Sequence, residues 1–418
     1  MAQRDLSKRE KLLLQLMGKY PDLTNEELSR IIGFKYAEYV STLQKKLRRR
    51  EYLVGPLMFP DWKKIFRNKV FRVYAFIMFD KTYDCIKSLL KEIDCWYIFY
   101  PLEEGIFRKY LVGFFNTDTE NLRKIFDYLK NEGIIHYYHL FEQEDNWEII
   151  NPTFLIDDAE APIEPDFEHL LDETSIPDLT YGSFTSISLD KVAQLLITHL
   201  CVGREGCDLK KIVRYEKNYR KEQRTILKEM LRKEKQEKTR KKLKAGLREL
   251  KGDLSLKEFR EVHQLLVEHG VLQKVYYIWP FPRSTCSTFW LFLKGNTLEA
   301  TKRAIFNFGR EVRIFTRVCL VQSVETGERY GAVFATGDPF LGGKLMKALD
   351  QHDEIKDRKL FPVRSYPASY WEGQTVSIEG YYNPETQTLD YPYNLFYERV
   401  KQKVEEGFDQ RREARALV

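Results

Sequence analysis

The residues with the clearest chemistry lie on one short predicted helix, residues 35–50. Val40, Leu43 and Leu47 recur at helical spacing and form one apolar stripe. Polar and basic side chains occupy the rest of the surface: Lys35, Tyr36, Tyr39, Ser41, Thr42, Lys45, Lys46, Arg48, Arg49 and Arg50. Polar side chains can read base edges, while lysine and arginine neutralise phosphates. The pattern predicts a nucleic-acid-binding helix in which Lys35, Tyr39, Ser41 and Thr42 face bases and the later cations hold phosphates. A solvated basic face on a small packing unit is the alternative.

The flanking residues predict how this helix is positioned. Thr24 followed by Glu27 forms a capping box for a short helix, and Gly33 ends that helix in a tight turn. A first helix over residues 7–18 and a wing strand over residues 52–55 complete the expected unit. The predicted unit is a winged helix-turn-helix.

A second basic stretch covers residues 210–251 and has too few apolar residues for a core of its own. It therefore forms a long solvated helix, a hairpin or a partly disordered segment. A charged exposed helix with local ion pairs and an arm that follows phosphates remain equal alternatives. The arm's candidate nucleic-acid-binding residues are Lys210, Lys211, Arg214, Arg220 and Arg224.

Composition limits the class of protein. The 418-residue chain is long enough for several domains, and its net charge of +6 means that a nucleic-acid surface must come from local clustering. The six cysteines form no metal-ligand cluster, so we expect buried thiols, no metal and no cofactor. The sequence has no signal peptide and no long apolar run, which predicts a soluble cytoplasmic protein without a membrane partner.

Strand and helix patterns alternate as β-α-β-β-α-β over residues 70–142, which is the ferredoxin-like order. The same order returns over residues 286–363, so the second half repeats the first. The expected fold class is α+β, with two tandem copies of a winged helix-turn-helix plus a ferredoxin-like βαββαβ domain; the long basic insertion alters the second winged helix. The expected domains are 1–60, 61–150, an acidic proline-containing linker at 151–187, 188–280, 281–366 and a tail at 367–418 with a final basic helix.

This order of elements resembles the Lrp/AsnC family of transcription regulators, which joins one winged helix to one ferredoxin-like sensing domain. The matching residues are Gly33, the helix over residues 35–50 and the wing at residues 52–55, together with the turn at residues 326–330. The resemblance implies sheet-to-sheet pairing of the sensing domains, either between the two copies or between chains. The family's acidic position near this turn is not acidic here, which argues against an amino-acid effector, and the effector stays unknown. Because only one reading head is well formed, a homodimer is expected.

Two binding functions fit these features. The first is a transcriptional regulator that reads DNA through residues 35–50. The alternative is a ribosome-associated factor that binds ribosomal RNA or the small subunit, because the chain also resembles an archaeal ribosome dimerisation factor in size and layout. The altered second head and the basic arm favour RNA, where shape and phosphate contacts dominate, whereas the intact first head favours DNA.

An enzyme is the third class considered. Haem-pathway decarboxylases resemble the same double-domain plan, and His136 and His139 lie on one predicted strand. Residues three apart on a strand point to opposite faces, so these histidines should not share a site. Since no nucleophile, phosphate-loop or metal motif is present, the sequence predicts a protein without catalytic activity.

Overall fold

The computed structural model describes residues 6–103, 105–151, 167–176, 184–187, 189–201, 208–250, 254–279, 281–311, 315–338, 340–364, 372–373, 378 and 380–406. Its first half contains α1 Lys8–Lys19, α2 Asn25–Ile32, α3 Ala37–Arg49, β1 Leu53–Pro60, α4 Trp62–Ile65, β2 Phe71–Phe79, α5 Tyr83–Leu90, β3 Trp96–Pro101, β4 Arg108–Asn116, α6 Thr119–Asn131 and β5 Tyr137–Ile150. The second half contains α7 Lys191–Cys201, α8 Leu209–Lys233, α9 Glu237–Glu249, α10 Leu256–Glu268, β6 Leu272–Ile278, η3 Arg283–Thr285, β7 Ser287–Gly295, α11 Leu298–Glu311, β8 Phe315–Ser323, β9 Arg329–Gly337, α12 Leu341–Leu349 and β10 Ile355–Val363. The tail adds β11 Glu372–Gly373, β12 Tyr382–Asn383, β13 Thr388–Leu389 and α13 Tyr393–Glu405.

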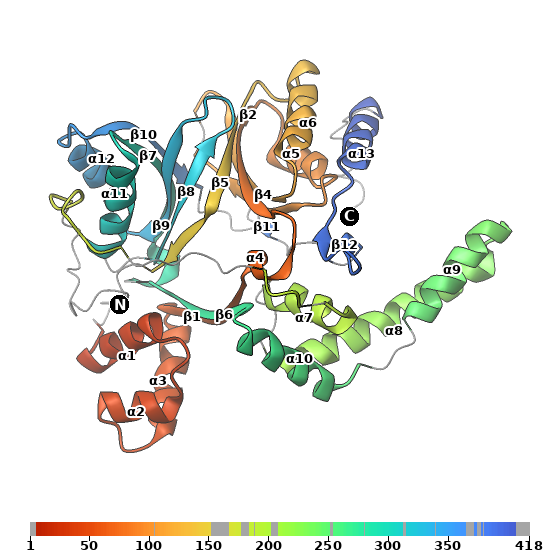
Figure 1. Ribbon diagram of the computed structural model, residues 1–418, viewed down its shortest axis with the longest axis horizontal. Helices are drawn as coiled ribbons and strands as arrows, with labels where there is room; N and C mark the ends of the chain where they lie inside the picture. Colours follow the sequence, from red (N-terminus) through yellow and green to blue (C-terminus); the bar gives the residue numbers. More distant parts are fainter. Residues whose placement is uncertain are drawn as a thin grey trace.

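The predicted fold class is confirmed: two tandem copies of a winged helix and a ferredoxin-like unit form one chain. In both ferredoxin-like units the last strand pairs with the first, and the two middle strands pair with each other. These strands are rich in branched and aromatic residues because most of them are buried. Figure 1 shows α5 and α6 outside the first unit and α11 and α12 outside the second.

The two ferredoxin-like units share one nine-stranded sheet in the order β10-β7-β9-β8-β5-β2-β4-β3-β11. The joint is the antiparallel pair β5–β8, in which Phe141 lies opposite Ser323. The two ends of the sheet also meet, because Leu102 after β3 bridges to Val363 at the end of β10. The sheet-to-sheet pairing that the resemblance implied is therefore seen here between the two ferredoxin-like units of one chain.

Aromatic rings from both units fill the space enclosed by this curved sheet. The ring centroids of Tyr74 on β2 and Trp290 on β7 are 4.8 Å apart, and those of Phe141 and Phe292 are 4.4 Å apart. Tyr74, Phe141, Trp290 and Phe292 are all buried. Such pairs add attraction beyond area burial, and these residues of both units belong to one hydrophobic cluster. The second unit has a further cluster of its own.

A buried charged cluster lies at the same joint. Glu148 on β5 is 2.5 Å from Arg72 Nη1 on β2 and 3.3 Å from Arg317 Nε on β8. Arg317 Nη2 also donates a hydrogen bond of 3.3 Å to the hydroxyl of Tyr74. All three charged residues are at most 8% exposed. This cluster, called here the joint cluster, ties three strands from both units together.

The wing strands differ from the sequence prediction. Each was expected to belong to its own head, but β1 pairs antiparallel with β6, so that Leu53 lies opposite Ile278 and Pro60 opposite Leu272. Leu53, Tyr276 and Ile278 pack in the core of the first head. The strand from the second head therefore completes the first head, which no local pattern could reveal.

The described parts of the predicted linker and of the predicted C-terminal tail are both packed on the ferredoxin-like units. Residues 152–166 and 177–183 of the linker lie outside the described residues, but Phe167 stacks on Phe308 of α11 with ring centroids 5.8 Å apart. The tail helix α13 packs on α5 and α6, and Lys403 Nζ binds Glu92 at 2.8 Å. The predicted end of this helix, residues 407–412, lies outside the described residues.

The basic insertion forms a helical hairpin, called here the arm. Arg240 on α9 donates hydrogen bonds to the carbonyl oxygens of Leu231 and Glu234, and a Cβ on Gly246 would lie 3.5 Å from Leu227. Figure 1 shows that the arm projects away from the sheet. Only the first part of α8 contributes core residues, such as Ile212 and Val213. The arm is therefore an exposed helical surface.

The cysteine thiols and the potential metal ligands bear on the chemistry that the chain can carry out. Cys85, Cys95, Cys286 and Cys319 are free thiols, and burial raises the pKa of Cys286 to about 12, so this thiol stays protonated at neutral pH. Cys207 lies outside the described residues. Within the described part of the chain, histidine, cysteine and acidic residues form no group able to hold a metal ion, and none of the helices has the length and apolar character needed to span a membrane.

Candidate nucleic-acid interface

Local sequence signals position α3 on the first head. Thr24 and Glu27 form the predicted capping box, with Thr24 N to Glu27 Oε2 at 2.8 Å and Glu27 N to Thr24 Oγ1 at 3.2 Å. Gly33 adopts a left-handed conformation with φ of 78°, which glycine tolerates without strain. Val40 and Leu47 are fully buried against α1 and α2. The opposite face of α3 therefore points away from the head.

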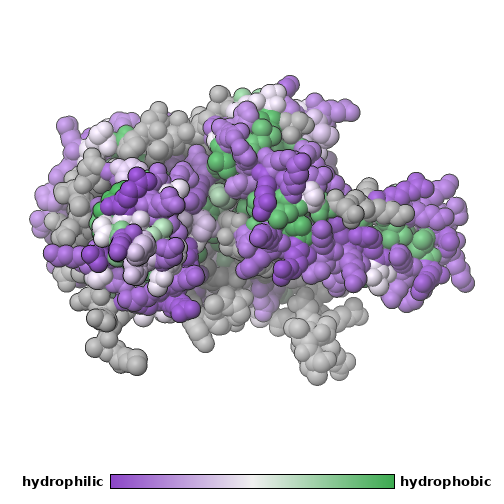
Figure 2. Space-filling model, turned by 90° about the horizontal axis from the view of Figure 1, so that it is seen from below, coloured by the Kyte–Doolittle hydropathy of each residue, from purple (hydrophilic) through white to green (hydrophobic). Residues whose placement is uncertain are grey.

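That opposite face carries most of the residues between 35 and 50 that were predicted to bind nucleic acid. Tyr36 is 50% exposed and Tyr39 is 53% exposed, with ring centroids 6.1 Å apart. Lys35, Thr42, Lys45, Lys46 and Arg49 are exposed as well. Among the residues that the structure describes, Lys45 and Arg49 have no ion-pair partner. Seen from below, the surface is largely hydrophilic over the head and over the arm (Figure 2).

Other predicted residues of α3 have intramolecular partners. Ser41 accepts a hydrogen bond of 2.9 Å from Asn25 Nδ2, which links α3 to α2. Arg48 Nε donates a hydrogen bond of 3.0 Å to the carbonyl oxygen of Gly55. Arg50 Nη1 is 3.1 Å from Glu10 Oε1. These three side chains hold the head together in the free protein.

Glu10 on α1 is the buried acid that neutralises two cations of α3. Its Oε1 is 2.9 Å from Lys46 Nζ, and it also contacts Arg50. Burial raises the pKa of the Glu10 carboxyl, but hydrogen bonds from Lys46 and Ser7 outweigh this effect and lower the pKa overall. The ion pairs of Glu10 could not be read from the sequence, because the basic partners lie about 40 residues away, although Ser7 and Glu10 also form a local capping box at the start of α1.

Replacing Glu10 with glutamine should change how the stability of the protein depends on pH. A carboxyl whose pKa is lowered by folding adds stability above its ordinary value of 4.5, and this stability is lost as the pH falls through the folded pKa. We expect the difference in unfolding free energy between the wild type and Glu10→Gln to shrink between about pH 6 and about pH 3. Urea unfolding at several pH values measures it. Glu38→Gln, at an exposed position of α3, is the control, and an equal change in both variants would contradict the assignment.

The arm's predicted residues lie in two places. Lys210, Lys211 and Arg214 are exposed near the start of α8. Arg220 and Arg224 instead line a groove farther along the helix, together with Lys217, Lys221 and Lys228, which the sequence analysis did not select. The spacing of these residues by three and four along one helix was the available signal.

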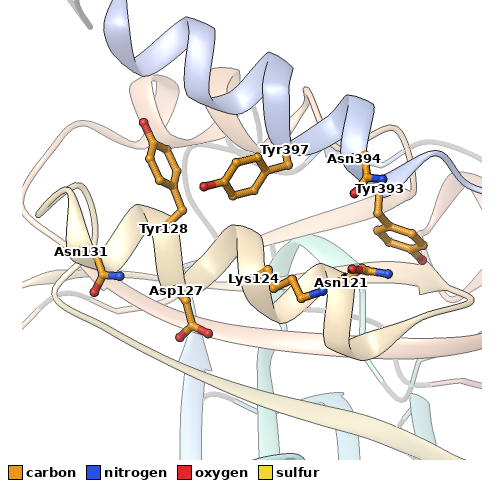
Figure 3. A pocket seen from close by; sticks show the side chains of 8 residues that line it. All are labelled: Asn121, Lys124, Asp127, Tyr128, Asn131, Tyr393, Asn394 and Tyr397. Carbon is orange, nitrogen blue, oxygen red and sulfur yellow. Dashed lines mark hydrogen bonds between the residues drawn. The ribbon is translucent and has the colours of Figure 1, made fainter.

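A second hollow lies between α6 and α13 and has a volume of about 420 Å³. Its lining residues are Asn121, Lys124, Asp127, Tyr128, Asn131, Tyr393, Asn394 and Tyr397. Figure 3 shows Tyr128 and Tyr397 reaching into the space between the helices, whereas Asp127 points away. Lys124 Nζ donates a hydrogen bond of 2.9 Å to Asn121 Oδ1. The hollow offers ring faces and amides to a polar ligand, but no concentration of charge.

The predicted effector turn at residues 326–330 is held by polar contacts. Gly327 has φ of 70°, and Tyr330 donates hydrogen bonds to Glu328 at 3.0 Å and Asp357 at 3.1 Å. Glu328 also contacts Lys294, while Arg329 Nε lies 2.6 Å from Glu144 Oε1. The charged groups of this turn therefore have partners within the protein.

The two histidines considered for catalysis have separate partners. His136 Nε2 lies 3.8 Å from Asp80 on the first unit, and His139 Nδ1 lies 3.5 Å from Glu325 on the second. Burial lowers the pKa of His139, although Glu325 partly opposes this shift, so the imidazole is neutral at pH 7. Neither histidine lines either of the two hollows.

No known protein family and no curated protein matches this sequence. Solved structures of similar fold include the siroheme decarboxylase NirDL, at 10% identity and a TM-score of 0.42, over 96% of this chain and 99% of that chain. Its complex with an iron-uroporphyrin III analogue gives 11% identity and the same score over 96% of this chain and all of that chain. E. coli AsnC matches 34% of this chain and 95% of its own at 11% identity, with a TM-score of 0.26. The protein PH0061 covers the same shares at 14% identity, with a TM-score of 0.24.

These comparisons correct one prediction from the sequence. A protein without catalytic activity was expected, but the structure that is similar over 96% of this chain is that of an enzyme. Missing local motifs were therefore not a valid reason to exclude catalysis for this double-domain plan. At these identities the likeness concerns the fold and assigns no reaction or substrate to this chain. None of the structures named here is a ribosome-associated factor.

Proposed function

We propose that the chain is a regulator that binds duplex DNA through the exposed face of α3. The observation that carries this proposal is the set of Lys45, Arg49 and their neighbours on the exposed face of α3, whose opposite face is packed against the head. Lys35, Tyr39 and Thr42 would reach base edges in the major groove, while Lys45 and Arg49 would bind phosphates. Ser41, Arg48 and Arg50 would mainly hold the helix in place, since each has an intramolecular partner.

The proposal includes two copies of the chain at one site. A palindromic site needs two equivalent reading helices, and the second head of this chain carries the arm in place of a short turn between helices. The matching α3 would then come from a second chain.

Selection from a random pool of DNA duplexes with the full-length protein tests this proposal. We expect enrichment of one sequence, arranged as an inverted repeat if two chains bind. Light scattering of the selected complex gives the number of chains. Failure to enrich any sequence over several rounds would count against α3 as a reading helix.

The ribosome-associated alternative predicts a different result in cell extract. On a sucrose gradient with DNase, a factor of the small subunit would sediment with ribosomal particles, while a DNA-binding regulator would stay in light fractions. Sedimentation with small subunits, unaffected by DNase, would replace the DNA proposal with the ribosomal one.

A further inference from the structure

A basic groove of about 470 Å³ runs along one face of α8 and is separate from α3. Its lining residues are Lys217, Arg220, Lys221, Arg224, Thr225, Lys228 and Leu254. Five of these seven are cations, and each of the five has another of them three or four residues away on α8. Such residues share a helix face, so the cations converge on one hollow.

Acidic residues compensate only part of the charge of this groove, at Arg220, which lies 3.5 Å from Glu216. Glu222 and Glu229 on the same helix are exposed but do not line the groove. Within the part of the chain that the structure describes, Lys217, Lys221 and Lys228 have no ion-pair partner. Like charges gathered at one site raise the local potential and attract counter-charge. The groove therefore favours an anionic occupant.

The floor of the groove is held in place by a buried polar chain. Arg220 is 5% exposed, and its Nε lies 3.5 Å from Glu216 Oε2. Glu216 Oε1 is in turn 2.6 Å from Nε2 of His199 on α7. Glu216 thus acts as a positioning residue, which fixes the stem of Arg220 below the exposed lysines. Leu254, 6% exposed, adds an apolar contact at the same hollow.

We infer that this groove binds a run of phosphates, as carried by a nucleic-acid strand or by a free polyphosphate. Five cations spread over about three helical turns match several successive phosphates better than one isolated anion. The lysines serve as mobile point charges, while Arg220 and Arg224 offer planar donor groups. The groove does not include α3, so it would bind phosphates even if α3 did not bind a specific DNA sequence.

The test compares two triple variants that remove equal charge from the arm. The groove variant replaces Lys217, Lys221 and Lys228 with alanine; the control replaces Lys233, Lys238 and Lys241, which are exposed and outside the groove. The probes are a fluorescent 16-nucleotide single-stranded RNA and, separately, tripolyphosphate measured by calorimetry. Each variant is also made in a chain with Lys35, Lys45 and Arg49 replaced by alanine, which removes the contribution of α3.

Of the two probes, the one that the wild type binds should bind the groove variant at least tenfold more weakly. The control variant should bind that probe as tightly as the wild type does. For the RNA, the plot of log K against log salt should become shallower by about 2, because three phosphate contacts are lost. Loss for the RNA alone identifies a nucleic-acid strand, and loss for tripolyphosphate identifies a free polyphosphate. If the wild type binds neither probe, or if both triple variants lose affinity equally, the inference is wrong. If the groove variant also binds more weakly than the control variant in the chain that lacks the α3 charges, the groove binds phosphates independently of the proposed DNA binding by α3.

Discussion

Replacing Glu148 with alanine is expected to destabilise the protein by about 3–5 kcal/mol, because it leaves two buried arginines without their shared carboxylate. Arg72 and Arg317 are 6% and 8% exposed and cannot turn to water without opening the core. The cluster also joins strands of both ferredoxin-like units, so the loss should affect both. Urea unfolding, followed by circular dichroism and tryptophan fluorescence, measures the change in unfolding free energy.

Glu144 on the same strand provides a matched control. It forms an ion pair of 2.6 Å with Arg329, but the arginine side chain is 56% exposed. Solvent-exposed pairs contribute at most about 1 kcal/mol, so Glu144→Ala should have a small effect. Equal destabilisation by both substitutions would show that burial of the joint cluster does not determine its contribution. Two separate unfolding transitions in the Glu148 variant would show that the cluster couples the units.

Alanine substitution of Lys35, Lys45 and Arg49 is expected to weaken binding of the selected DNA duplex on the order of 10²-fold at about 0.1 M salt, because one contact to a base edge and two phosphate contacts are lost. The slope of log K against log salt should become shallower by about 2, since each phosphate contact contributes roughly one counterion. Lys46 is left intact because its loss would also remove a partner of buried Glu10. Fluorescence anisotropy over a series of salt concentrations measures both quantities.

A second triple variant controls for the change in net charge. Lys344, Lys347 and Lys356 are exposed residues of the second ferredoxin-like unit, far from α3 in the sequence. Their replacement with alanine removes the same charge and should leave DNA affinity within about twofold. Thermal unfolding of both variants should match the wild type. Unchanged DNA affinity in the α3 variant would remove the basis of the proposed function.

Local signals predicted much of the architecture. The capping box at Thr24 fixed the start of α2, Asp118 caps α6, and β10 ends at Val363, where the predicted order of elements in the second unit ends. These features depend on residues close together in the sequence. Caps and apolar periodicity report on the backbone conformation of one element, and so the order of elements could be read directly.

Long-range contacts explain what the sequence did not reveal. The pairing of β1 with β6 joins strands more than 200 residues apart, and neither strand carries a signal for its partner. Glu148 follows an irregular stretch of β5 between Gln143 and Glu148, where the pairing register shifts. Simple alternation along β5 therefore could not place Glu148 in the core.

The candidate site could be predicted only in part, because some of its features depend on local sequence and others on long-range contacts. The exposed face of α3 follows from helical periodicity, but the partners of Ser41, Arg48 and Arg50 depend on how neighbouring elements pack. Along α8, composition indicated a basic arm and spacing could have grouped the cations on one face, but only the structure shows that they line a groove together with Leu254. Charge content alone left a solvated helix and a binding arm as equal alternatives.

The joint between β5 and β8 gives this chain a freedom that a pair of identical subunits lacks. Across a twofold axis each residue is matched by a copy of itself, so any change appears on both sides at once. Here the two facing strands are separate stretches of one chain, and Glu148 on one meets Arg317 on the other. Each side of the joint could therefore change independently during evolution. A duplicated gene with such a joint can keep one head as a reader while the other acquires an arm.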